Sequence, residues 1–200
     1  MSDHAPDEIL EKDFPARARA VLSPHAPDLA RLAEGARPAA VLMPLLRVEG
    51  AWHLLFTVRP ADMPTHAGEI CFPGGRLKPG EMPLAAALRE AHEETGIDPA
   101  HVTPIGFCAP RRTGSGHVIA PLLGMVTQGA RIHPCPREVA EVFTAPLAHF
   151  LHPANYRREC VQWRGQARAY WIIDCNGRRI WGATAAILHD LQRRLAGATS

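Results

Sequence analysis

The sequence lacks the features by which several large classes of protein are recognised. No apolar run approaches the roughly 20 residues that a membrane-spanning helix needs, and there is no internal repeat or extended low-complexity segment. The net charge of the 200 residues is only +2, which gives no reason to expect a nucleic acid partner. Because 46% of the residues are hydrophobic, the chain can instead bury one sizeable core.

Patterns that would indicate disulfides, zinc or secretion are also missing. The cysteines are odd in number, five, and form no CxxC pair, so we expect reduced thiols. The eleven histidines include no HxH or HxxxH pair. The first residues, MSDHAPDEILEKDF, are acidic and polar where a signal peptide would be basic and then apolar, so a cytoplasmic location without a membrane partner is expected.

Apolar runs alternate with turn signals in a way that predicts a mixed α/β protein. Residues 39–48 and 52–59 flank the sequence EGA, a hairpin signal in which Gly50 takes a positive φ. Strands and helices are interleaved, so we expect an α/β sandwich and not a regular βαβ repeat. Further strands are predicted at 102–108, 117–126 and 167–174, and helices at 146–151 and 182–197.

The two ends of the chain are predicted to be helical. Residues 7–22 mix apolar and charged side chains at loosely helical spacing, and a proline-broken connection follows. We therefore expect residues 1–37 to form a helical extension packed on the core. Residues 38–200 then form the main domain, which ends in the helix at 182–197.

The stretch PGGRLKPGEMPLAAALREAHEETGI, residues 73–97, predicts a helix of unusual charge. Pro83 suits a first turn and Gly96 a left-handed cap, so the helix should span about residues 82–95. Helical spacing predicts that one stripe faces the core and that the glutamates lie away from it. The stripe comprises Leu84, Leu88, Ala91 and Thr95, and the glutamates are Glu90, Glu93 and Glu94.

Like charges at this spacing disfavour a helix, which requires an explanation. One interpretation is a solvated acidic face balanced by Arg89. The alternative starts from the preceding loop, FPGGRLKPGE, which can turn sharply and bring carbonyl oxygens and Glu81 to the same patch. Carboxylates and carbonyls form an all-oxygen site that suits Mg²⁺ or Mn²⁺, and hydrolysis of a phosphoanhydride is the chemistry natural to such a site.

The same residues resemble a known family. From Gly75 to Ile97 the spacing reproduces the Nudix box, G-x5-E-x7-RE-U-x-EE-x-G-U, with every glycine and charged position matched. One position departs from the pattern, because Ala91 stands where a bulkier aliphatic residue is usual. The resemblance implies a Nudix hydrolase whose mixed β-sheet lies between helices.

The resemblance also implies roles for individual residues. Glu90 and Glu94 are expected to bind the metal ion, with Glu93 contributing to further ions or to the activation of water. A carbonyl of Gly74 or Gly75 is expected to complete the metal shell. The residues implied to orient and support the glutamates are Arg89 and Glu81.

A second resemblance precedes the box and suggests the substrate. Residues 54–75 resemble the coenzyme A pyrophosphatase signature, so cleavage of coenzyme A or a derivative to 3′,5′-ADP and 4′-phosphopantetheine is expected. Pro60 and Pro64 depart from the signature, the latter at its second arginine. Because Pro64 cannot bind a phosphate, other cationic side chains are candidates to contact the substrate phosphates. The matching positions are Thr57, Arg59, Gly68, Phe72, Pro73, Gly74 and Gly75, and the candidate cations are Arg59, Arg76, Lys78, Arg111 and Arg112.

Several alternatives stay open at this point. The base that activates water is Glu93 or a residue of PREVAEVF, Glu138 or Glu141. The substrate is a coenzyme A compound or another nucleotide, such as an ADP-sugar or a dinucleotide polyphosphate. A Nudix-fold module that binds a nucleotide without cleaving it is the third possibility. A homodimer is the assembly that the resemblance leads us to expect.

Overall fold

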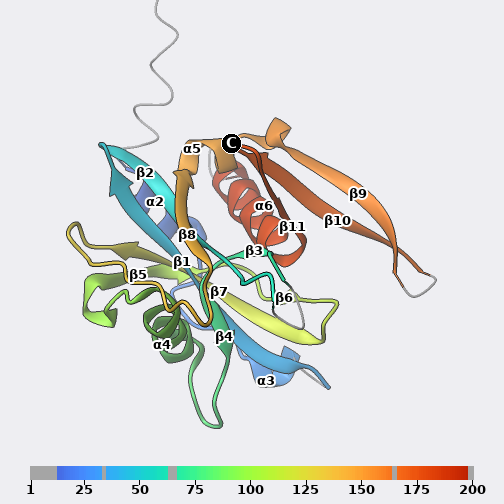
Figure 1. Ribbon diagram of the computed structural model, residues 1–200, viewed down its shortest axis with the longest axis horizontal. Coiled ribbons are helices and arrows are strands. Elements are labelled where there is room, and N and C mark those ends of the chain that lie inside the picture. The colour runs from blue at the N-terminus through green and yellow to red at the C-terminus, as the bar shows by residue number, and fades with distance from the viewer. Residues whose placement is uncertain (1–12, 33–34, 63–66, 164–165, 198–200) are drawn as a thin grey trace, which may run out of the picture.

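The computed structural model describes residues 13–32, 35–62, 67–163 and 166–197, and it shows a large mixed sheet, a small antiparallel sheet and helices against both (Figure 1). The mixed α/β architecture predicted from the sequence is confirmed. Within the described residues, no helix is long and apolar enough to cross a membrane.

The large sheet is built on the predicted hairpin. Glu49 and Gly50 both have positive φ at its turn, as a two-residue hairpin loop requires. The strand order is β3-β2-β1-β7-β5, and β1 and β7 run parallel while the other pairs are antiparallel. Three further strands pair at the sides: β4 with β1, β6 with β7 and β8 with β2. The strands are β1 (Arg37–Val48), β2 (Ala51–Val58), β3 (Ile70–Cys71), β4 (Gly74–Arg76), β5 (Val102–Phe107), β6 (Arg111–Arg112), β7 (His117–Val126) and β8 (Glu141–Pro146).

The small sheet follows in the order β11-β10-β9, and its long β9–β10 hairpin projects from the body of the molecule (Figure 1). The prediction for residues 167–174 falls inside β10, whereas β8, β9 and β11 were not predicted. The strands of the small sheet are β9 (Tyr156–Trp163), β10 (Gln166–Cys175) and β11 (Arg178–Trp181). The helical elements are α2 (Phe14–Val21), α3 (Leu29–Leu32), α4 (Pro83–Thr95), η1 (Pro99–His101), α5 (Leu147–Leu151), η2 (Pro153–Asn155) and α6 (Gly182–Gly197).

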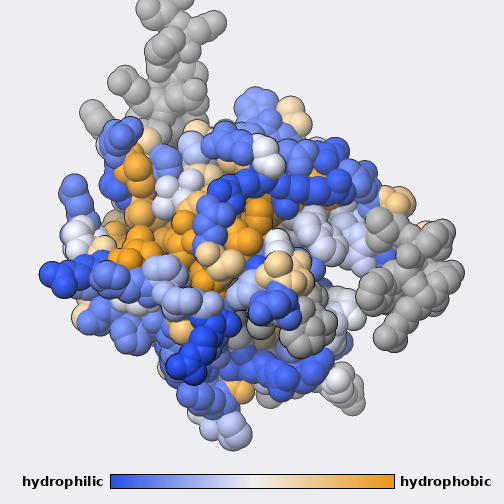
Figure 2. All heavy atoms as spheres, viewed as in Figure 1, coloured by the Kyte–Doolittle hydropathy of each residue, from blue (hydrophilic) through white to orange (hydrophobic). Residues whose placement is uncertain are grey.

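The central strands are apolar on both sides because helices cover both faces of the sheet. Leu42 packs with Ala86 and Ala87 of α4, whereas its neighbour Met43 faces the opposite way and packs in the cluster that contains Leu188 of α6. The main sheet thus separates α4 from α6. On the face shown in Figure 2, hydrophilic residues form most of the rim and apolar residues gather near the middle.

The buried stripe predicted for α4 is wrong in part. Leu84 is 37% exposed, whereas Leu88 is half-buried and packs against the edge of the core cluster that contains Ala86 and Ala87. Small side chains take the buried positions, because alanine lets the helix axis lie closer to the sheet than leucine would. Glu94, predicted to point away from the core, is buried with them. The buried residues are Pro83, Ala86, Ala87, Ala91, Glu94 and Thr95.

The first described helix belongs to the main core. Phe14 and Ala18 of α2 are buried in the cluster that contains α6. The chain then pairs with the end of β5, because the backbone N–H groups of Ser23 and Phe107 each donate to the carbonyl of the other. Residues 1–12 lie outside the described part of the chain, and the division after residue 37 stays a prediction.

Candidate active site

The C-terminal end of α4 is held by a segment that lies far along the chain. Gly96 caps the helix with φ of 73°, and its N–H donates to the His92 carbonyl, as predicted. Residues 127–140, which we call the strap, cross this end. The backbone N–H groups of His133 and Cys135 donate to the carbonyls of Thr95 and Glu94 at 2.7 and 2.9 Å. These bonds satisfy carbonyls that a helix end otherwise leaves without partners.

Two adjacent glycines, Gly74 and Gly75, allow strand β4 to lie close to both β1 and α4. A Cβ atom on Gly74 would lie 2.4 Å from the Ala40 carbonyl oxygen of β1. A Cβ atom on Gly75 would lie 2.4 Å from the carboxylate carbon of Glu90. Any side chain at position 74 would therefore strike backbone, and any side chain at 75 would displace the Glu90 carboxylate.

Glu94 lies against the same two glycines and is only 7% exposed. Its Oε2 accepts a hydrogen bond from the Gly74 backbone N–H at 3.2 Å. Burial raises the pKa of the Glu94 carboxyl to about 8, and the negative charge of Glu90 adds to the effect. The Gly74 bond and the charge of Arg59 oppose this rise without cancelling it.

Arg89 gathers the other box residues. Its Nε and Nη2 donate to the two oxygens of Glu81, each at 2.8 Å, and Nη1 donates to Glu90 at 2.8 Å and Glu93 at 3.0 Å. Nη2 also donates to the Arg76 carbonyl. These bonds hold the pKa of Glu81 at about 2 and raise that of Arg89. The guanidinium therefore fixes the loop, the start of α4 and two glutamates relative to one another.

Two charged groups from outside the box also act on Glu94. Arg59, at the end of β2, lowers its pKa, and Glu138 of the strap raises it. The Arg59 Nε is buried and has no hydrogen-bond partner among the described residues. Glu141, the other base candidate, binds Arg178 at 2.6 Å instead.

The remaining predicted site residues divide between this site and another region. Lys78 lies 3.9 Å from Glu93, and its backbone N–H donates to Glu81. Arg76 contributes the carbonyl that Arg89 binds. Arg111 lies elsewhere, because its Nη2 donates to the Ala186 carbonyl of α6. Pro64 lies outside the described residues.

The chemistry of the Glu90 and Glu94 oxygens suits a hard divalent cation. In the described part of the chain, no group of three or more histidine, cysteine or acidic side chains is arranged to hold a metal ion. Mg²⁺ usually binds one or two carboxylates and completes its shell with waters and substrate phosphates. Glu90 and Glu94 lie one helical turn apart, beside Gly74 and Gly75 of β4, and meet that requirement.

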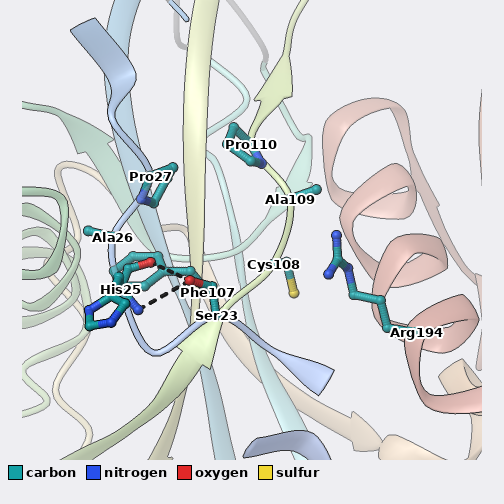
Figure 3. Close-up of a pocket in the computed structure, with 9 residues that line it drawn as sticks. All are labelled: Ser23, His25, Ala26, Pro27, Phe107, Cys108, Ala109, Pro110 and Arg194. Carbon is teal, nitrogen blue, oxygen red and sulfur yellow. Dashed lines mark hydrogen bonds between the residues drawn. The ribbon is translucent and has the colours of Figure 1, made fainter. Parts of the chain in front are cut away.

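A separate pocket of about 300 Å³ lies between the chain after α2, the end of β5 and α6 (Figure 3). None of its lining residues is a predicted site residue. Two of its polar side chains are already bonded: the Ser23 hydroxyl donates to the His25 carbonyl, and Arg194 donates to Asp190. The glutamates, and not this pocket, are therefore the candidate catalytic centre.

Sequence reasoning missed the strap and the burial of Glu94. The strap binds the helix through backbone groups, which leave no residue signature. The burial of Glu94 had a signal in the helical spacing, since it lies three residues from Ala91 and seven from Ala87. Ranking leucine above alanine as a core residue concealed that signal.

Comparison with known proteins gives one consistent family. The family model described as NUDIX domain matches residues 36–163. A protein of Photorhabdus laumondii, described as uncharacterized Nudix hydrolase NudL, is 36% identical over 166 residues, which cover 82% of this chain and 88% of that protein. A protein of the same description from Klebsiella pneumoniae is 34% identical over 192 residues, 96% of each chain.

A solved structure supports the same fold. The MutT protein from Methanosarcina mazei Go1 matches with a TM-score of 0.51 at 17% identity, over 82% of this chain and 95% of that one. At this identity the likeness concerns the arrangement of the sheet and helices alone.

The two glycines should respond differently to alanine. In Gly75→Ala the new methyl group meets only the Glu90 carboxylate, so the free energy of unfolding should change by less than about 1 kcal/mol while hydrolysis falls at least about 100-fold. In Gly74→Ala the methyl group meets backbone, so the fold itself should lose about 2 kcal/mol or more. Urea unfolding and turnover measure the two effects. A fully active Gly75→Ala protein would show that Glu90 does not need its present position.

Glu94→Gln should stabilise the protein when divalent ions are removed. The pKa of Glu94 is about 8 in the folded protein against 4.5 for a free side chain, so unfolding releases a proton between these values and stability falls as pH rises from 4.5 to 8. Glutamine removes this loss, which reaches on the order of 4 kcal/mol at pH 8. Urea unfolding in EDTA at several pH values tests this, with the exposed Glu93→Gln as control. Parallel pH curves for wild type and Glu94→Gln would contradict it.

Proposed function

Because the chain belongs to the Nudix hydrolase family, which acts on pyrophosphate bonds, we propose that it uses Mg²⁺ or Mn²⁺ to hydrolyse the pyrophosphate of coenzyme A or a derivative. The observation that carries the catalytic part of this proposal is the buried Glu94 carboxylate beside Gly74 and Gly75 of β4, with Glu90 one helical turn away. A purely structural helix would gain nothing from a carboxylate in this position.

Glu90 and Glu94, with a carbonyl of Gly74 or Gly75, would hold the divalent ion. The bound ion supplies positive charge for phosphate oxygens and for water that is to be deprotonated. Arg89 keeps Glu90 from turning away, because it binds one Glu90 oxygen and is itself fixed by Glu81. Mutating Arg89 or Glu81 would therefore act on catalysis through the position of Glu90.

Arg59 is the cation best placed to bind a substrate phosphate. It lies close enough to Glu94 to lower its pKa, and its buried Nε has no partner in the part of the chain that the structure describes. A phosphate oxygen beside the glutamates would supply that partner. Lys78 and Arg76 flank the exposed side of the site at Glu93 and Arg89.

Water attacks one phosphorus of the anhydride, the bridging P–O bond breaks, and a proton leaves the water. Glu93 is the proposed acceptor for this proton, since its side chain is 46% exposed and lies on the solvent side of the glutamates. Glu138 is the alternative, because it is exposed and lies near Glu94. Glu141 is less suited, since both of its oxygens accept hydrogen bonds from Arg178.

The choice of a coenzyme A substrate rests on the residues before the box. Two of the signature positions have structural features that a substrate site would use: Arg59 has no hydrogen-bond partner at Nε among the described residues, and Gly68 has φ of 68°. Phe72 is buried and stacks on Phe56, so it supports the site only through packing. The names of the relatives state a Nudix hydrolase and no substrate. An ADP-sugar or a dinucleotide polyphosphate is the alternative substrate.

Mass spectrometry of the products tests the proposal directly. The purified protein is incubated with Mg²⁺ or Mn²⁺ and a panel of coenzyme A, acetyl-coenzyme A, ADP-ribose, a dinucleotide polyphosphate and nucleoside triphosphates. Release of 3′,5′-ADP from the coenzyme A compounds is expected, and Glu94→Gln should reduce the rate at least about 100-fold without unfolding the protein. Cleavage of another member alone would keep the chemistry and change the substrate. No cleavage of any would favour a nucleotide-binding module.

A further inference from the structure

The arginines of the C-terminal half divide into two groups. Arg178, Arg179 and Arg194 each donate to a carboxylate at 2.6 to 2.7 Å. Arg157 also pairs with Asp174 and Glu159. For the second group, no ion pair is found within the described residues. Three of its members come from elements that meet at α6: Arg111 of β6, Arg158 of β9 and Arg193 of α6. Its other members are Arg112, Arg131, Arg137 and Arg168.

Arg158 and Arg193 lie on either side of one aromatic stack. The imidazole ring of His189 on α6 stacks on the indole of Trp171 with 3.8 Å between ring centroids. Arg158 faces Trp171 across the β9–β10 ladder, with its guanidinium carbon 5.4 Å from the ring centroid. Arg193 follows His189 by four residues and therefore lies on the same face of α6.

Arg111 reaches the same face of α6 from β6. Its Nη2 donates to the carbonyl of Ala186, one turn before His189, at 3.3 Å. Its Nε is buried and has no hydrogen-bond partner in the described structure. Arg111, Arg158 and Arg193 form what we call the arginine cluster. Burial lowers the pKa of His189, and all three of these arginines lower it further.

Asp190, the acidic residue next to His189, already accepts hydrogen bonds from other groups. Asp190 accepts hydrogen bonds at Oδ2 from the Ala109 backbone N–H and from the Nε of Arg194. It therefore offsets Arg194, and it also raises the pKa of His189. None of the three guanidinium groups around His189 has an ion-pair partner among the described residues. A dianion would supply a counter-charge, and the planar donor array of a guanidinium matches the oxygens of a phosphoryl group.

We propose that the arginine cluster, with His189 at its centre, binds a phosphate monoester at a site separate from the glutamates. The two sites lie against opposite faces of the main sheet, since α4 packs in one core cluster and α6 in the other. Figure 1 shows α4 and α6 well apart. Trp171 is covered by His189 and Arg158, so the site binds the phosphoryl group and offers no free indole face for a base.

The ligand class has a simple relation to the proposed reaction. Hydrolysis of a pyrophosphate yields two phosphate monoesters, so either product could occupy the arginine cluster. Inorganic phosphate has the same chemistry. Binding itself needs neither a divalent ion nor the glutamates, so it can be tested without any turnover.

Nuclear magnetic resonance of the histidine rings tests the proposal. Inorganic phosphate and AMP are titrated separately in EDTA, and the His189 signal is assigned by its loss in His189→Gln. A saturable shift of this signal, with a higher His189 pKa in the complex, is expected for at least one of the two ligands. Tighter binding of AMP would indicate a nucleotide monoester, and equal or tighter binding of phosphate would indicate the free ion. No saturable shift with either would overturn the proposal.

Charge variants give the control. Arg158→Gln/Arg193→Gln should weaken binding at least about tenfold, and Arg193→Gln alone should weaken it by a smaller factor. Arg179→Gln removes the same single charge as Arg193→Gln, on the face of the small sheet opposite to Arg158, and should leave binding within about twofold. Arg193→Gln alone changes one exposed side chain and serves if the double variant does not fold. Glu94→Gln should bind as the wild type does, so loss of hydrolysis and loss of phosphate binding are distinguished. If Arg179→Gln weakened phosphate binding as much as Arg193→Gln does, the effect would come from the net charge of the protein, and the proposed site would be contradicted.

Discussion

The burial of the Glu94 carboxylate against Gly74 and Gly75 of β4 is the constraint on which the rest of the site depends. A carboxylate in this position loses its hydration and gains only one backbone hydrogen bond, so its ionised form is disfavoured. Everything around it maintains this arrangement. The glycines leave the space, the alanines of α4 bring the helix close to the sheet, and Arg89 holds Glu90 at the same place. A bound divalent cation would neutralise the ionised Glu94 carboxylate, so the free energy that its burial costs would contribute to the affinity of the site for the cation.

The supports of the site come from distant parts of the sequence. The strap fixes the C-terminal end of α4 and carries Glu138 to the neighbourhood of Glu94, and its own end joins β2 through the Ala140 N–H and the Val58 carbonyl. That bond lies next to Arg59. One segment therefore connects the metal side of the site with the cation proposed to bind substrate. On the opposite face of the sheet, the arginine cluster, for which no ion pair is found among the described residues, lies around His189 of α6 and forms the proposed phosphate site.

Local signals allowed much of this arrangement to be predicted. The hairpin at Gly50, the start of α4 at Pro83 and its end at Gly96 follow from backbone preferences of single residues, and the structure confirms them. The chemistry was indicated by a different local signal, the spacing of Arg89 and the glutamates, which brings their side chains together on one helix. The rotation of α4 could not be read in this way, because it depends on how closely the helix approaches the sheet. Nor could the strap or the position of Arg111, since these result from contacts between segments far apart in the sequence.

Binding of Mn²⁺ to the protein without substrate, measured by electron paramagnetic resonance of the free ion, tests the central claim most directly. The account predicts a saturable site whose affinity falls at least about 100-fold in Glu90→Gln/Glu94→Gln, with a much smaller change in Glu93→Gln. Equal affinity in the wild type and the double variant would contradict it, because the carboxylates beside Gly74 and Gly75 would then not hold the metal.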